Sequence, residues 1–117
     1  MINGDLIKSN KYSTEEIDTG KTWIDGRHIY RKVIATTSPA NNNTWTDYNN
    51  NISNLDFYLT CYAFFKVEAL FYISNYYEGN SGFFLAVPKV DTISINIVPT
   101  NWANRPMYIV MEYIKKS

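Results

Sequence analysis

Few residues of this chain have the types and spacing that catalysis or metal binding requires. His28 is the only histidine and Cys61 the only cysteine, so the usual cluster of histidine and cysteine metal ligands cannot form within one chain. A Ser-His-Asp arrangement is formally possible, but the sequence contains no G-x-S-x-G nucleophile motif. It contains no phosphate-binding glycine loop either. The sequence therefore predicts no catalytic, cofactor-binding or metal-binding residue.

Acidic residues offer the only other route to an enzyme. Two carboxylates facing each other could hydrolyse a glycosidic bond, and the candidates are Asp25, Asp47, Asp56, Glu68 and Glu78. Asp25 is explained better by a tight turn with Gly26, and no spacing pairs the others. A glycan-active enzyme is therefore the least supported class, and we expect a protein that is not an enzyme.

Aromatic residues beside asparagine-rich segments suggest binding instead. Aromatic faces stack on the CH-rich faces of sugars, and neighbouring amides supply hydrogen bonds. The candidate glycan-binding residues are Trp45, Tyr48, Tyr76, Tyr77 and Trp102. The alternative, which we favour for Trp102 and Tyr76, is that these rings plug the ends of the fold or pack against another subunit. Cys61 lies in an apolar run without a basic neighbour, which indicates a buried small hydrophobic residue.

Bulk composition bounds the class of protein. The 117 residues suit one domain with a real core, and 11 basic residues balance 11 acidic ones. This balance gives no electrostatic reason to expect nucleic acid or an anionic membrane as a partner. No segment approaches the length of a membrane span, and the N-terminus does not resemble a signal peptide. We expect a soluble protein made in a cytoplasm.

The N-terminal third predicts an arm followed by a hairpin. Residues 1–18 are polar with scattered apolar anchors, which predicts an extended arm with at most one helical turn near Thr14–Ile17. Asp25-Gly26 then separates the strand-like runs Thr22–Ile24 and Arg27–Thr37. Because a type I′ turn needs positive φ at both central residues, Asp-Gly predicts that turn here. The polar run from Ser38 to Asn51 predicts a loop.

The remaining chain alternates in the manner of strands. From Leu55 to Phe65 one face carries Leu55, Phe57, Leu59, Cys61, Ala63 and Phe65, and the opposite face is aromatic and only partly polar. Further strands are predicted at Lys66–Tyr77, Phe83–Val87, Thr92–Val98 and Met107–Ile114. Both faces of the last strand are apolar, which favours a central strand or one covered by a partner. The composition, with 10 Tyr, 6 Phe and 3 Trp, also favours sheet.

These elements predict an all-β protein. About seven short strands without a convincing helix indicate an antiparallel β-sandwich or jelly roll with an extended N-terminal arm. The predicted division is residues 1–18 as arm or linker and residues 19–117 as the β-sandwich domain.

Three motifs resemble one family in the same order along the chain. Tyr12–Glu16 (YSTEE), Gly20–Gly26 (GKTWIDG) and Ile29–Lys32 (IYRK) closely match the "YSTEE…GTWIDGKPLYRK" opening of C-terminal β-sandwich modules in phage and prophage proteins of Gram-positive hosts. These modules end tail-fibre, baseplate and other minor structural proteins. Asn51–Asp56 resembles their "GISNID" step, and Asn104–Lys115 resembles their closing "NRPVYVTLEYTK" strand.

The resemblance implies a structural protein of the virion. Such modules are commonly trimeric tips that are displayed on the particle and often take part in attachment to the host surface. We therefore expect a small fibre or fibre-tip domain that forms a homotrimer, joins other virion proteins through its arm and binds a host surface glycan. The alternative is an auxiliary capsid or head-fibre module without receptor binding. Neither needs a cofactor, nucleic acid or membrane insertion.

Overall fold

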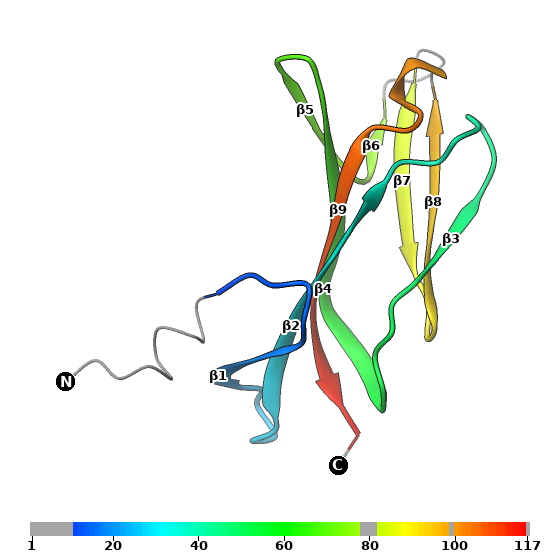
Figure 1. Cartoon of the computed structure of the whole chain (residues 1–117). Helices are drawn as coiled ribbons and strands as arrows, with labels where there is room; N and C mark the ends of the chain where they lie inside the picture. Colours follow the sequence, from blue (N-terminus) through cyan, green and yellow to red (C-terminus); the bar gives the residue numbers. More distant parts are fainter. Residues whose placement is uncertain (1–10, 78–81, 99, 117) are drawn as a thin grey trace.

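Two antiparallel sheets pack face to face in the computed structural model, which describes residues 11–77, 82–98 and 100–116 (Figure 1). The five-stranded sheet has the order β1-β2-β9-β4-β5 and the four-stranded sheet the order β3-β8-β7-β6. The strands are β1 (Ile17–Thr22), β2 (His28–Thr37), β3 (Thr46–Asn49), β4 (Leu55–Val67), β5 (Leu70–Ile73), β6 (Tyr76–Tyr77), β7 (Phe83–Pro88), β8 (Thr92–Val98) and β9 (Pro106–Lys115). The predicted all-β sandwich is confirmed.

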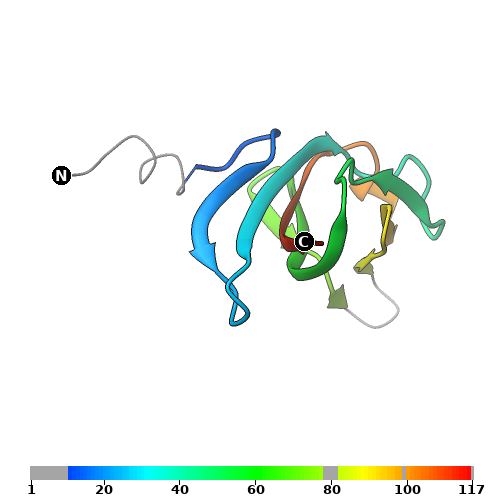
Figure 2. The same ribbon diagram turned by 90° about the horizontal axis from the view of Figure 1, so that it is seen from below.

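The core consists of buried side chains from both sheets, whose strands Figure 2 views from below. From the five-stranded sheet it takes the alternate residues Met107, Ile109, Met111 and Tyr113 of β9, all fully buried. From the four-stranded sheet it takes Ile93, Ile95 and Ile97 of β8, which are equally buried. The only described helical element is the short 3₁₀ turn η1 (Thr100–Trp102). No helix among the described residues is long and apolar enough to cross a bilayer.

The first hairpin forms around Asp25-Gly26 but with a different turn from the one predicted. Gly26 N–H donates to Trp23 O at 2.9 Å, and Trp23 N–H donates to Arg27 O at 2.8 Å. Within the loop Gly26 has a φ of 91°, whereas Ile24 and Asp25 are not at positive φ. This is a three-residue loop, a type I turn closed by a glycine bulge, so the predicted type I′ turn is wrong. Only Gly26 carries the left-handed conformation that the loop needs.

Strand β1 lies earlier in the chain than predicted. Ile17 and Asp18 pair with Arg31 and Tyr30 of β2, so the sheet begins inside the segment predicted as arm. Residues 11–16 lie along the same sheet instead of reaching away from it, with a bend at Thr14-Glu15 in place of a helical turn. Residues 1–10 of the predicted arm lie outside the described residues.

The segment Lys66–Tyr77 is not the single strand that its composition indicated. Lys66 and Val67 end β4, and Glu68, with a φ of 56°, turns the chain back into β5. Asn75, with a φ of 67°, then carries the chain across to the other sheet, where Tyr76 pairs with Phe84. Neither turn contains glycine or proline, which is why the pattern concealed them.

A further strand lies in the segment predicted as a loop. Thr46–Asn49 forms β3 and pairs with Thr92–Ile95 of β8. Its polar residues hid it, because β3 is an edge strand with its alternate residues exposed. With β3 and the division of Lys66–Tyr77, the described strands number nine rather than about seven.

Two irregularities in β4 change which residues face the core. The register with β9 shifts between Leu55 and Phe57 and again between Tyr58 and Thr60. Tyr58 therefore joins Cys61 and Ala63 on the core side. Phe57 lies on the outer side, where its ring meets Trp23 at 6.0 Å. The strict alternation predicted from Leu55 to Phe65 is therefore wrong at its N-terminal end and right from Cys61 onward.

Candidate functional site

The only histidine forms an exposed pair with an acidic residue. His28 Nδ1 lies 2.6 Å from Asp18 Oδ2, and the two side chains are 52% and 45% exposed. The shallow depression beside them is lined by Asp18, Arg27, His28, Tyr30, Lys115 and Lys116. None of these six is a serine, threonine or cysteine, so the depression does not contain the nucleophile of a Ser-His-Asp or Cys-His arrangement.

Two of the candidate carboxylates lie close together on one guanidinium group. Arg27 contacts Asp25 Oδ2 at 2.8 Å and Asp56 Oδ2 at 2.7 Å. The side-chain hydrogen bond from Arg27 holds the pKa of Asp25 below its usual value. A glycosidase acid needs a raised pKa to keep its proton, so this arrangement opposes that role. The two ion pairs of Arg27 instead tie the first hairpin to β4.

Within the described part of the chain, no group of three or more His, Cys, Asp or Glu residues could hold a metal ion.

Cys61 packs against the core beside β9, and we expect its thiol to be unreactive. Burial raises its pKa to about 12, so roughly one molecule in ten thousand carries the thiolate at pH 8. We expect Ellman's reagent to leave the folded protein unmodified at pH 8 and to modify one thiol per chain in concentrated urea. Rapid modification without urea would show that the thiol is accessible and reactive.

Among the five candidate glycan-binding residues, Trp102 is buried. Its side chain is 4% exposed, and its ring lies 4.4 Å from that of Tyr72 and 5.7 Å from that of Phe65. Its carbonyl accepts a hydrogen bond from the Ser38 hydroxyl at 2.5 Å. Tyr76 borders the same cluster, 6.3 Å from Trp102. These contacts match the packing alternative and leave Trp102 no free face for a sugar.

The other candidates do not form one surface. Tyr48 donates its hydroxyl to Thr37 O at 2.6 Å, and burial raises its pKa to about 12. Trp45 is 50% exposed and directly precedes β3, whereas Tyr77 is 68% exposed on β6. Because β3 and β6 are the two edges of the four-stranded sheet, three strand spacings, or roughly 14 Å, separate them.

Aromatic side chains gather instead on the outer face of the five-stranded sheet. Strand register places Val33, Val110 and Tyr62 in one row across β2, β9 and β4. The next row consists of Ala35, Tyr108, Phe64 and Ile73. Rings of Phe64 and Tyr108 lie 5.5 Å apart, and those of Tyr62 and Phe64 lie 6.5 Å apart. The rows form a continuous apolar strip that the other sheet does not cover.

A groove of about 440 Å³ runs over this strip. Its floor consists of Val33, Tyr62, Phe64, Tyr108 and Val110, and residues 12–14 line one side. We call it the outer groove. Its volume lies within the range of small-molecule sites, which are mainly apolar with a few polar groups.

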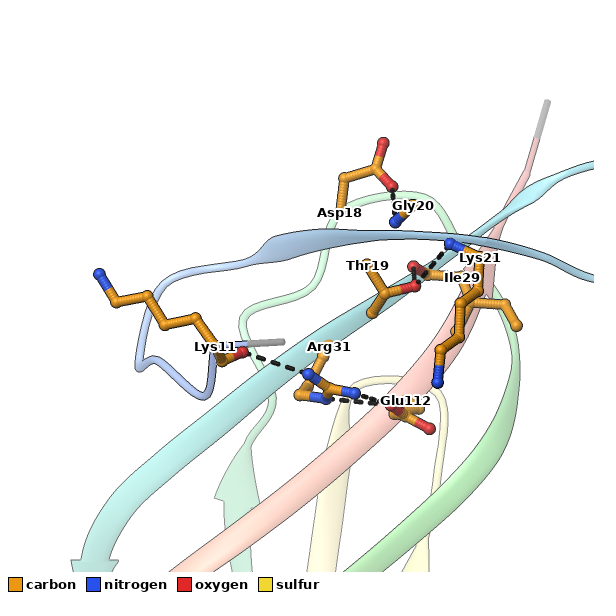
Figure 3. A network of polar contacts seen from close by, with 8 residues as sticks. All are labelled: Lys11, Asp18, Thr19, Gly20, Lys21, Ile29, Arg31 and Glu112. Atoms are coloured by element: carbon orange, nitrogen blue, oxygen red, sulfur yellow. Dashed lines mark hydrogen bonds and ion pairs between the residues drawn. The ribbon is translucent and has the colours of Figure 1, made fainter. Parts of the chain in front are cut away.

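Contacts of Arg31 hold the wall of the outer groove in place, and Figure 3 shows those with Lys11 and Glu112. Arg31, 7% exposed, binds Glu112 through Nη2 at 2.7 Å and through Nε at 3.0 Å. Its Nη1 donates to Lys11 O at 3.2 Å, and its guanidinium lies 4.3 Å from the centre of the Tyr12 ring. Val33 N–H donates to Ser13 O at 2.9 Å, in the manner of an added strand. One buried arginine therefore fixes the segment that forms the wall.

The apolar strip continues to the edge of the same sheet through Ile73, which pairs with Phe64. Leu70, Phe71 and Ile73 of β5 are 60%, 67% and 58% exposed, and we call them the β5 edge patch. Phe71 and Ile73 lie on the outer face, whereas Leu70, opposite Val67, lies on the other face of the strand. Strand β5 is the last in its sheet, so one of its sides has no strand partner within the described residues. Exposed apolar edge strands are prone to pair with other chains unless something covers them.

No protein-family model, curated protein or solved structure matches the chain. The sequence carries one signal for the outer groove, namely the aromatic second face predicted for Leu55–Phe65. The sequence pattern does not contain the strand register that places Tyr62 and Phe64 beside Val110 and Tyr108.

Proposed function

We propose that this chain is a structural protein of a bacteriophage virion, a small fibre or fibre-tip domain that assembles as a homotrimer and binds a glycan on the host surface. The similarity of its three motifs to fibre and baseplate modules supports the virion role. The β5 edge patch is the observation that supports self-association.

The chemistry of the β5 edge patch favours a second copy of the chain as its partner. Leu70, Phe71 and Ile73 carry no polar atoms in their side chains, and all three are more than half exposed. Interface cores between copies of one chain are more apolar than ordinary surface. A closed ring of copies would cover the patch on every copy, whereas a monomer would leave it in water.

Replacing Phe71 by lysine is expected to give a folded monomer. A charge on an exposed edge strand blocks edge pairing, while the side chain, 67% exposed, adds little to the core of a single copy. Light scattering should report a mass near three times 13.6 kDa for the unchanged chain and near 13.6 kDa for the variant. The matched control is Val90→Lys, at a position 72% exposed on the other sheet's loop, which should remain trimeric. A monomeric unchanged chain at micromolar concentration would refute the trimer.

The virion role has its own test. An antibody against the purified chain should label phage particles in electron micrographs, and the position of the label should distinguish a tail fibre from an auxiliary head fibre. Purified particles that contain no such chain would overturn the proposed function.

A further inference from the structure

We propose that Asp25-Gly26 is a site of spontaneous isomerisation to isoaspartate, and that Arg27 suppresses this modification for as long as the chain is folded. The reaction needs no enzyme, and water is its only co-reactant. It reroutes the main chain of the first hairpin through the side chain of Asp25.

The reaction joins the side chain of Asp25 to the backbone of Gly26. The amide nitrogen of Gly26 attacks the side-chain carboxyl carbon of Asp25, and the carboxyl hydroxyl group leaves with the amide proton as water. The product is a five-membered cyclic imide. A water molecule then opens the imide at one of its two carbonyl carbons, which gives back aspartate or leaves isoaspartate. One water is lost and one is gained, so the mass of the chain does not change.

Local chemistry at this loop favours the reaction. Asp25-Gly26 is the only Asp-Gly or Asn-Gly pair among the residues that the structure describes. Glycine has no side chain to obstruct the approach of the carboxyl group, and a Cβ atom at Gly26 would meet nothing within 4 Å. The Asp25 side chain is 41% exposed, so water reaches it. Sequence and exposure alone therefore predict a reactive pair.

Hydrogen bonds of the folded chain hold both reacting groups. Gly26 N–H donates to Trp23 O at 2.9 Å, so the attacking nitrogen must first leave the turn. Asp25 Oδ1 accepts from the backbone N–H of Arg27 at 3.0 Å, and Asp25 Oδ2 accepts from Arg27 Nε at 2.8 Å. Arg27 Nη2 also lies 2.8 Å from Oδ2. Both carboxylate oxygens are therefore held away from the imide geometry by one residue.

Other strands hold the guanidinium group of Arg27 in turn. Its Nη1 donates to Asp56 Oδ2 at 2.7 Å and to Lys115 O at 3.0 Å. The group also lies 5.6 Å from the centre of the Phe57 ring. These contacts come from β4 and β9, which are distant from the hairpin in the sequence. Protection of Asp25 is therefore a property of the tertiary structure, and unfolding removes it.

The charge of Asp25 acts in the same direction as the geometry. A neutral carboxyl group loses water readily, whereas a carboxylate does not, so the reaction proceeds through the protonated form. The side-chain hydrogen bond from Arg27 holds the pKa of Asp25 below its usual value, and the backbone N–H of Arg27 adds to this effect. In mildly acidic solution, fewer folded chains therefore carry the reactive form than would without Arg27.

Isomerisation would loosen the first hairpin. Isoaspartate adds one methylene group to the main chain between Trp23 and Arg27, whose backbone N–H and C=O close the loop at 2.8 Å. It also moves the free carboxylate away from the side-chain position that Arg27 contacts. The modified chain would lose the contact that links the hairpin turn to the guanidinium bound by Asp56.

The test measures isoaspartate at Asp25 in the full chain during incubation near pH 5, with circular dichroism to confirm that each chain is folded. Trypsin digestion followed by liquid chromatography and mass spectrometry separates the isoaspartate peptide, which has an unchanged mass. The unchanged chain should isomerise more slowly when folded than in concentrated urea. Folded Arg27→Met should isomerise roughly two- to fivefold faster than the unchanged chain, the range that an exposed ion pair supports. In urea the two chains should react at the same rate.

Two further variants separate release of Asp25 from general destabilisation. Arg27→Lys keeps the positive charge but loses the paired donors, and we expect an intermediate rate. The matched control, Arg31→Met, makes the same substitution at a more buried ion pair and leaves the contacts of Asp25 in place. It should isomerise at the rate of the unchanged chain although it is less stable.

Three results would overturn the inference. Equal rates for folded Arg27→Met and the folded unchanged chain would show that Arg27 does not protect Asp25. A larger acceleration in Arg31→Met than in Arg27→Met would assign the rate to general loss of stability. Equal rates for the unchanged chain with and without urea would show that the fold gives no protection. None of these outcomes depends on trimer formation or on antibody labelling of the virion.

Discussion

Replacing Trp102 by alanine is expected to lower the free energy of unfolding by about 3–5 kcal/mol, the usual cost of removing a buried aromatic side chain. Its indole is 4% exposed and packs among the rings of Tyr72, Phe65 and Tyr76. The alanine variant leaves a cavity that these large rings cannot close by small movements. Urea unfolding followed by circular dichroism measures the loss.

Trp45→Ala is the matched control, because it removes the same side chain from a position that is 50% exposed. We expect it to cost less than about 1 kcal/mol. Both variants should be measured at one protein concentration, since self-association makes apparent stability depend on concentration. Equal effects of the two changes would contradict the buried position of Trp102. A loss of host binding in Trp102→Ala would report loss of the fold rather than loss of a ligand contact.

Replacing Arg31 by methionine is expected to cost roughly 2–4 kcal/mol, somewhat less than breaking a fully buried ion pair. Arg31 is 7% exposed but Glu112 is 29% exposed, so water can partly solvate the carboxylate that remains. The change also removes the bond to Lys11 O and the contact with the Tyr12 ring. The wall of the outer groove should therefore loosen together with the loss of stability.

Hydrogen exchange distinguishes this local effect from a general one. The Val33 amide donates to Ser13 O, so its exchange should accelerate more than the global loss of stability explains. Adding Glu112→Gln to Arg31→Met should recover part of the stability, because it removes the unpaired charge. The control Arg27→Met breaks the exposed ion pairs with Asp25 and Asp56 and should have a smaller effect. Unchanged exchange at Val33 in Arg31→Met would show that Arg31 does not hold the segment.

Local sequence patterns were sufficient to predict the fold class and several element boundaries. The period of two over Thr92–Val98 and over the last strand predicted strands close to β8 and β9, because buried faces demand apolar residues at alternate positions. Proline, which lacks a backbone N–H, located the end of β7. Glycine, which readily adopts positive φ, located the turn at Gly26. The aromatic second face of Leu55–Phe65 and the two apolar faces of the last strand also predicted an apolar surface that another chain could cover.

Which aromatic residues share a surface depends on contacts between segments that are distant in the sequence. The sequence allowed Trp102 to be a ligand contact and favoured packing, and it is buried because segments far apart in the sequence, at Phe65 and Tyr72, close over it. Tyr62 and Tyr108 lie far apart in the sequence and are brought onto one face by the pairing of β4 with β9. Two register shifts in β4, between Leu55 and Phe57 and between Tyr58 and Thr60, set which side chains face outward. Local patterns fix faces one strand at a time, and register between distant strands, which those patterns do not encode, brings the faces together.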